Sequence, residues 1–238
     1  MKKLLICLIA IFVSGCAAKK LSETDEQRIR NVGVVSIIPE DATFQKIGLT
    51  VFNNEKTVID MNGQLTATIT STVNSRLAQS RPQWKVKDIG FEQSALLEKY
   101  KTSDGKIPSD PGKIKKDLAQ LAKNNGLDAI IVFFPMSYEH AIPGKGVGVI
   151  LRTMSLSSIG RGYAHAAIGM TFVDQQGETM VYEHIGAEKF SKAIDVDGYG
   201  MKYSLEANMT PEMTDRLKAD MKNLLQQNIT TTLISIGM

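Results

Sequence analysis

Cysteine is almost absent from this chain of 238 residues. The two cysteines, Cys7 and Cys16, both lie close to the amino terminus, and none follows. If Cys7 is removed with a signal and Cys16 is modified, the remaining chain has no free thiol. A disulfide within one molecule, a thiolate nucleophile and a cysteine metal site are then all excluded.

A strong excess of one charge is also lacking. The chain has 28 basic and 25 acidic residues, and the basic residues are dispersed apart from short clusters such as Lys113, Lys115 and Lys116. Nucleic-acid binding requires a concentrated positive surface, because phosphate neutralisation supplies most of the affinity. We therefore expect no nucleic-acid partner.

The common catalytic motifs are missing. There is no Gly-x-Ser-x-Gly elbow, no His-Glu-x-x-His pair and no dinucleotide-binding glycine triplet. Their absence lowers the expectation of an enzyme without excluding one, because paired carboxylates leave no local motif. No cofactor is predicted, and the question of catalysis stays open with a binding role favoured.

The chain lacks a hydrophobic run long enough to cross a bilayer. The apolar run from Leu4 to Val13 has ten residues, which as a helix rise about 15 Å against about 30 Å of hydrocarbon. Lys2 and Lys3 precede this run and the small residues Ser14 and Gly15 follow it. This order is typical of a secretory signal peptide.

The tetrapeptide VSGC, residues 13–16, completes this segment. It resembles the lipobox of bacterial lipoproteins, although Val13 stands where that motif usually has leucine. The resemblance implies that the signal is cut before Cys16 and that this cysteine carries lipid, which makes the membrane a partner. Two or three acyl chains suffice for permanent anchoring, since each buried methylene contributes about 0.8 kcal/mol. The alternative is an ordinary signal whose cysteine lies near the cut by chance.

Ala17 bears on the location. By the sorting rule of enteric bacteria, this residue after the lipidated cysteine implies the outer membrane, facing the periplasm. We predict a signal peptide at 1–15, a lipidated tether at 16–30 and a single α/β periplasmic domain at 31–238. Loss of Lys2 and Lys3 with the signal would lower the formal charge from +3 to +1.

Periodicity predicts the fold class. Near-continuous apolar runs at 32–38 and 129–135 are typical of strands buried on both faces, whereas a four-residue period from Leu65 to Leu77 predicts a helix. Strand-like pieces are expected at 43–52, 55–60 and 84–91, and helices at 94–101, 111–125 and 211–236. The alternation of strands and helices predicts an α/β domain with a mixed sheet and flanking helices. Shorter extended runs after residue 140 predict an antiparallel hairpin that turns at DQQG, residues 174–177.

Three residues are candidate ligand or partner contacts. If position 174 pairs with 177, His165 and His184 are diagonal neighbours on one sheet face, within about 7 to 8 Å. Two histidines are too few for a closed zinc site, so no metal is predicted and a polar or interface role is favoured. Lys145 lies in PGKGVGV, residues 143–149, which departs from the P-loop pattern and is predicted to be a loop between strands. DVDGYG, residues 195–200, matches a calcium loop only in part and is interpreted as a turn.

Two resemblances extend beyond the anchor. Residues 30–55 resemble an uncharacterised group of proteobacterial proteins that open with a valine-rich strand and a GxTVFNN segment, which implies no function. The overall layout is similar to periplasmic lipoproteins of the curli-secretion type, which implies assembly or partner activation at the outer membrane. We expect a binding or assembly module with an envelope protein partner or a homo-oligomeric state. The alternative is a small-ligand-binding protein or a hydrolytic enzyme that uses the loops of residues 140–200.

Overall fold

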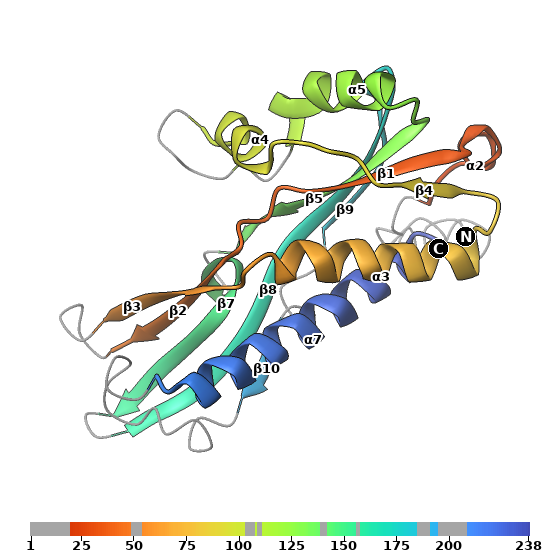
Figure 1. Ribbon diagram of the computed structural model, residues 1–238. Coiled ribbons are helices and arrows are strands. Elements are labelled where there is room, and N and C mark those ends of the chain that lie inside the picture. Colours follow the sequence, from red (N-terminus) through yellow and green to blue (C-terminus); the bar gives the residue numbers. More distant parts are fainter. Residues whose placement is uncertain are drawn as a thin grey trace, which may run out of the picture.

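The computed structural model describes residues 20–48, 54–102, 108, 111–138, 142–155, 158–184, 191–194 and 209–238. Within them, strands and helices alternate and form a mixed sheet with helices on both faces (Figure 1), which confirms the predicted α/β class. The elements are α2 (Glu23–Arg28), β1 (Asn31–Ser36), β2 (Asp41–Ile47), β3 (Glu55–Asp60), α3 (Gln64–Ser80), β4 (Lys85–Lys87), α4 (Gln93–Tyr100), η2 (Pro111–Ile114), α5 (Lys115–Asn124), β5 (Ala129–Pro135), β6 (Ser137–Tyr138), β7 (Ile142–Ser155), β8 (Ser158–Asp174), β9 (Thr179–His184), β10 (Ser191–Ile194) and α7 (Pro211–Ser235).

Strand β8 connects the two halves of the sheet. The strand order is β3-β2-β7-β8-β5-β1-β4, with β9 and β10 also paired to β8 and β6 paired to β7. The first part of β8 pairs with β7 and β10, and its second part pairs with β5 and β9. The change of partner falls between Ala167, which faces Gly146, and Ile168, which faces Pro135. Figure 1 shows β8 running diagonally through the molecule as a consequence.

The two apolar runs form neighbouring parallel strands, as their sequences predict. β1 and β5 pair from Val32 opposite Ala129 to Ser36 opposite Phe133. Every residue of β5 is buried, and all of β1 except Asn31 is buried. Burial on both faces explains why neither run alternates between apolar and polar residues.

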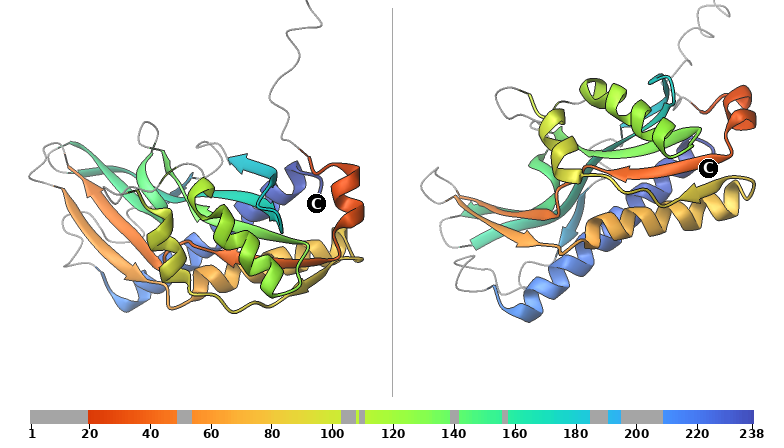
Figure 2. Two further views of the ribbon diagram at one scale, coloured as in Figure 1. Left: turned by 90° about the horizontal axis from the view of Figure 1, so that it is seen from above. Right: turned by 45° about the horizontal axis from the view of Figure 1, so that its top comes forward.

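Helices α3 and α7 lie side by side and cover one face of the sheet (Figures 1 and 2). The predicted stripe of α3 is fully buried, and so are most apolar positions of α7. Thr210 caps α7 because its side chain accepts a hydrogen bond from the backbone N–H of Met213, and Pro211 occupies the first turn. The buried stripes consist of Leu65, Ile69, Val73 and Leu77 on α3, and of Leu217, Met221, Leu225, Ile229 and Leu233 on α7.

Helices α4 and α5 cover the opposite face of the β1 and β5 half (Figure 2). Ile114, Leu118 and Ala122 are fully buried against this face, together with Tyr100 at the end of α4. The predicted helix at 111–125 opens as a 3-10 turn, η2, before α5 begins at Lys115. Gly126, just beyond α5, has a φ of 57°, the left-handed conformation in which glycine commonly follows a helix.

The hairpin at DQQG is confirmed. β8 and β9 are antiparallel, and the backbone N–H of Gly177 donates to the carbonyl of Asp174 at 3.0 Å. The Asp174 side chain also accepts hydrogen bonds from the backbone N–H groups of Gln176 and Glu178, each at 2.9 Å. Gly177 has a φ of 84°, a conformation in which glycine is favoured.

The folded domain begins before Asn31, the residue at which the sequence pattern predicts it to start. Residues 21–29, called the N-terminal clasp below, contain α2 and bury Leu21 and Ile29. Arg28 donates a hydrogen bond to Asp174 at 3.0 Å, which raises the pKa of the guanidinium, and Glu26 pairs with Arg81. Burial of two aliphatic side chains stabilises this attachment by roughly 1.5–3 kcal/mol for each. The polar composition of this segment conceals the attachment, because only two of its nine residues are apolar.

A ring packed over a glycine fixes the β5 and β8 contact. Pro135 and Phe134 end β5, and Phe134 pairs with Gly169. A Cβ at position 169 would lie 2.4 Å from two atoms of the Phe134 ring and 2.9 Å from the sulfur of Met136. The ring therefore occupies the space of the missing side chain.

We expect Gly169→Ala to lower the free energy of unfolding by about 1–3 kcal/mol, the usual cost of overpacking a filled core. The matched control is Gly90→Ala, because a Cβ at position 90 would meet no atom within 4 Å. Urea denaturation followed by circular dichroism measures both variants. Equal midpoints for the two variants would contradict this packing.

Candidate functional site

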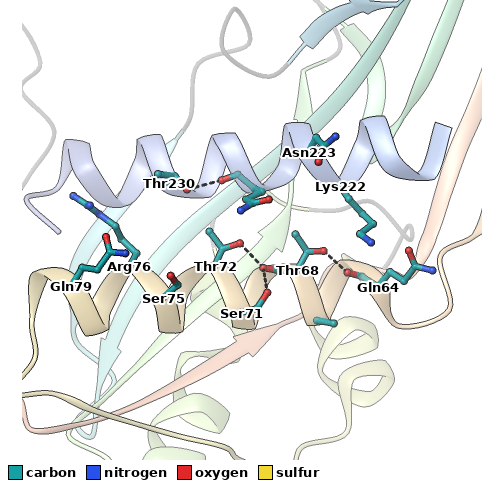
Figure 3. A pocket seen from close by; sticks show the side chains of 12 residues that line it. Gln64, Thr68, Ser71, Thr72, Ser75, Arg76, Gln79, Lys222, Asn223 and Thr230 are labelled. Atoms are coloured by element: carbon teal, nitrogen blue, oxygen red, sulfur yellow. Dashed lines mark hydrogen bonds between the residues drawn. The ribbon is translucent and has the colours of Figure 1, made fainter. Parts of the chain in front are cut away.

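A polar groove of about 870 Å³ runs between the outward faces of α3 and α7 (Figure 3). The two helices pack through their apolar stripes on the sheet side, so the groove lies on the side away from the core. Twelve residues line it: Gln64, Ala67, Thr68, Ser71, Thr72, Ser75, Arg76 and Gln79 from α3, and Lys222, Asn223, Gln226 and Thr230 from α7. No aromatic residue is among them.

The middle of the α3 side of the groove consists of small side chains. Ala67, Ser71 and Ser75 are exposed and follow one another at helical spacing. The hydroxyl of Thr68 donates to the carbonyl of Gln64 at 2.7 Å, and that of Thr72 donates to the carbonyl of Thr68 at 2.6 Å. Such bonds satisfy hydroxyl groups within a helix. They explain how the threonine-rich stretch TATITSTV remains helical, and they leave the oxygen lone pairs as acceptors.

The groove carries positive charge without negative charge. Arg76 and Lys222 are the charged residues of its lining, which contains no aspartate or glutamate. Arg76 donates from Nε to the backbone oxygen of Met238 at 2.9 Å. Lys222 forms no ion pair with any residue that the structure describes. Two cations surrounded by amides and hydroxyls favour a polar ligand with negative charge.

Sequence reasoning did not find this groove. Motif searches test for reactive or metal-binding groups, and the lining consists of amides, hydroxyls and two cations on two helices far apart in the chain. The available signal was the row of small hydroxyl residues opposite the apolar stripe of α3. That signal identifies a solvent-facing side but not the helix that packs beside it.

The structure corrects the interpretation of PGKGVGV. Its residues belong to β7 rather than to a loop, and Lys145 pairs in register with Ser137 of β6. Val147 and Val149 are buried, and Gly146 has a φ of 63°, which accommodates an irregularity inside the strand. Glycine weakens a strand, so its frequency here favoured a loop in the sequence pattern.

The predicted proximity of His165 and His184 is wrong. His184 pairs with Gly169, two positions further along β8 than the expected Ala167. The turn sets Asp174 opposite Glu178 rather than Gly177, and a β-bulge between Phe172 and Val173 shifts the pairing by one more residue. His165 pairs with Gly148 of β7 and Ser191 of β10. His165 and the residue that faces His184, Gly169, are therefore four positions apart on β8, about 13 Å along the strand. The same shift sets Tyr182 opposite Thr171.

His165 is completely buried beside Gly148. A Cβ at position 148 would lie 2.9 Å from Nε2 of His165 and 2.2 Å from the carbonyl oxygen of Thr43. Nδ1 lies 3.2 Å from the carbonyl oxygen of Gly146. A carbonyl oxygen only accepts, so Nδ1 carries the proton and Nε2 is an acceptor without a partner. Burial lowers the pKa of His165 to about 4, although the bond to Gly146 opposes this shift.

We expect the buried histidine to make the fold sensitive to acid. The folded pKa of His165 lies below its ordinary value, so the unfolded chain binds more protons between about pH 6.5 and pH 4. The free energy of unfolding should fall by about 3 kcal/mol through this interval as pH decreases. His165→Asn, which retains an N–H donor, should lose that part of the pH dependence. Urea titrations at several pH values test this, and equal slopes for the two proteins would contradict it.

Metal sites, membrane-spanning helices and the two remaining sequence candidates, Cys16 and DVDGYG, complete the search for functional features. Among the described residues, no group of three or more His, Cys, Asp or Glu side chains could hold a metal ion, and no helix has the length and apolarity required to cross a membrane. Cys16 and DVDGYG, at 195–200, lie outside the described residues. Their roles remain predictions from the sequence.

Comparison with known proteins adds little to these observations. No protein-family model matches the chain, and no curated protein matches it. One similar solved structure is titled "Crystal Structure of Lipoprotein GNA1162 from Neisseria meningitidis". The match has 12% sequence identity and a TM-score of 0.30, and it covers 83% of this chain and 99% of that chain. With so low a score the match carries no functional argument.

Proposed function

We propose that this chain is a lipoprotein of the bacterial envelope, anchored through Cys16 to the periplasmic face of the outer membrane. Its role is to bind an acidic segment of another envelope protein in the groove between α3 and α7. The sequence VSGC behind a short apolar run supports the anchor. The observation that carries the binding role is a groove lining with two cations and no carboxylate.

The N-terminal clasp gives the proposed anchor a short reach. Leu21 is buried, only five residues after Cys16, so the intervening chain spans at most about 17 Å. A lipid on Cys16 would therefore hold the α2 end of the domain near the bilayer. The tether predicted at 16–30 would have allowed a much longer reach.

The anchor is tested by fractionating cells of a Gram-negative host that express the full chain. We expect the parent protein in the membrane fraction, with a mass that includes acyl chains. Cys16→Ser should move it to the soluble fraction, because the thiol that accepts the lipid is gone. Cys7→Ser is the matched control and should stay in the membrane. Membrane retention of Cys16→Ser would contradict anchoring at this residue.

The groove is tested with a photoreactive amino acid at Ser71, on the exposed side of α3. Irradiation of intact cells of the source bacterium should give a discrete adduct, and the same probe at Gln120, exposed on α5 across the sheet, should not. Lys222→Glu should reduce the Ser71 adduct at least fivefold by adding a negative charge to the groove. Lys116→Glu, exposed on α5, is the charge control. Equal adducts from both probe positions would refute the proposal, as would no effect of Lys222→Glu.

A further inference from the structure

Strand β3 has an open outer edge at the end of the sheet away from α2 (Figure 1). The strand pairs with β2 in the register that sets Asp60 opposite Asp41, and the backbone N–H of Met61 donates to the carbonyl of Glu40. Hydrogen-bonded and non-bonded pairs alternate along an antiparallel ladder. The backbone groups of Lys56, Val58 and Asp60 therefore point away from β2. No strand of the described part pairs with them.

The side chains of these three residues are also exposed together. Strand geometry places positions 56, 58 and 60 on one face, and all three are exposed. Val58 is 55% exposed, one of two large hydrophobic residues so exposed in the described part of the chain. On this unpaired edge, Val58 lies between the cation Lys56 and the anion Asp60. An antiparallel strand that places an anion opposite Lys56, an apolar residue opposite Val58 and a cation opposite Asp60 would be complementary to it.

We propose that two copies of this chain associate by antiparallel pairing of their β3 edges, with the twofold axis at Val58. In this register Val58 meets Val58 of the second copy, and Lys56 of each copy faces Asp60 of the other. All outward backbone groups of the three residues then exchange hydrogen bonds, six in total for three pairs. Opposite charges and apolar side chains that face each other across strands both stabilise a sheet.

The two neighbouring registers that satisfy the same backbone groups pair fewer opposite charges. A shift by two residues in one direction sets Lys56 opposite Val58, and a shift in the other sets Asp60 opposite Val58. Each shift leaves charges without opposite partners. A lysine on an edge strand ordinarily hinders pairing, but here the residue that faces it is an aspartate. The self-complementary pattern is the reason to name a second copy, rather than an unrelated strand, as the partner.

The proposed contact between the two β3 strands is small, so the fraction of dimer depends on the local concentration of the chain. Two strands of six residues bury less than the roughly 1,200 Å² of a stable interface, so the isolated domain should dimerise weakly. Confinement to one membrane raises the effective concentration of copies. The pairing itself does not depend on the anchor, but its extent in cells would increase with it.

A disulfide formed across the twofold axis tests both the pairing and its register. Val58→Cys in the full chain should yield an oxidised dimer in isolated membranes, because paired Cα atoms in such a ladder lie about 5.5 Å apart, within disulfide range. Lys56→Cys should yield at least fivefold less dimer, since two copies of that residue would lie about 13 Å apart. Co-expressed Lys56→Cys and Asp60→Cys chains should crosslink to each other. The parent chain shows the background from Cys7 and Cys16.

Charge exchange provides a second readout. In the Val58→Cys chain, Lys56→Asp or Asp60→Lys should each reduce the dimer at least threefold, and the double exchange should restore it. Thermal unfolding of each variant verifies that it is folded. Equal crosslinking of Val58→Cys and Lys56→Cys, or no rescue by the double exchange, would overturn the proposal. The same crosslinks in a Cys16→Ser background separate the pairing from the anchor. Dimer in the soluble fraction would uphold the pairing without the anchor, whereas dimer with Cys16→Ser retained in the membrane would uphold the pairing and refute anchoring at Cys16.

Discussion

The structure depends on β8, a strand of 17 residues whose two edges are both used along its length. Its residues on the α7 side increase in size along the strand, from Ala164 and Ala166 to Met170 and Phe172. The alanines leave room for α7 to approach, and Asn228 of that helix donates to the carbonyl of Ala166 at 3.5 Å. A slip of one residue would turn every one of these side chains to the other face. The register of β8 therefore determines where both helical layers can pack.

This arrangement separates three surfaces of the molecule. The N-terminal clasp binds at the turn after β8 through Arg28 and Asp174. The groove lies outside α3 and α7, and the open edge of β3 lies at the far end of the sheet. A lipid-bound chain would thus have its α2 end directed towards the bilayer and its β3 edge away from it.

The elements of the fold could be read from the sequence where periodicity is strong. The stripe of α3, the caps of α7 and the runs of β1 and β5 depend on local patterns, and all are present in the structure. The β8 and β9 register was missed because the turn and a β-bulge each shift the pairing by one residue, and neither shift leaves a clear mark in one sequence. The groove was missed because it arises from the packing of two helices about 150 residues apart in the chain. Local patterns determine elements, whereas sites made between elements depend on tertiary packing.

The proposed dimer and the proposed groove are compatible because the chain connects them directly. α3 begins at Gln64, four residues after Asp60, and Gln64 lines one end of the groove. Pairing of two β3 edges would bring two such ends towards the twofold axis, with both grooves on one composite surface. A partner with two acidic segments would then bind with an affinity greater than either contact provides alone. Weak edge pairing and weak groove binding would reinforce each other on the membrane, which offers a reason for a small interface to persist.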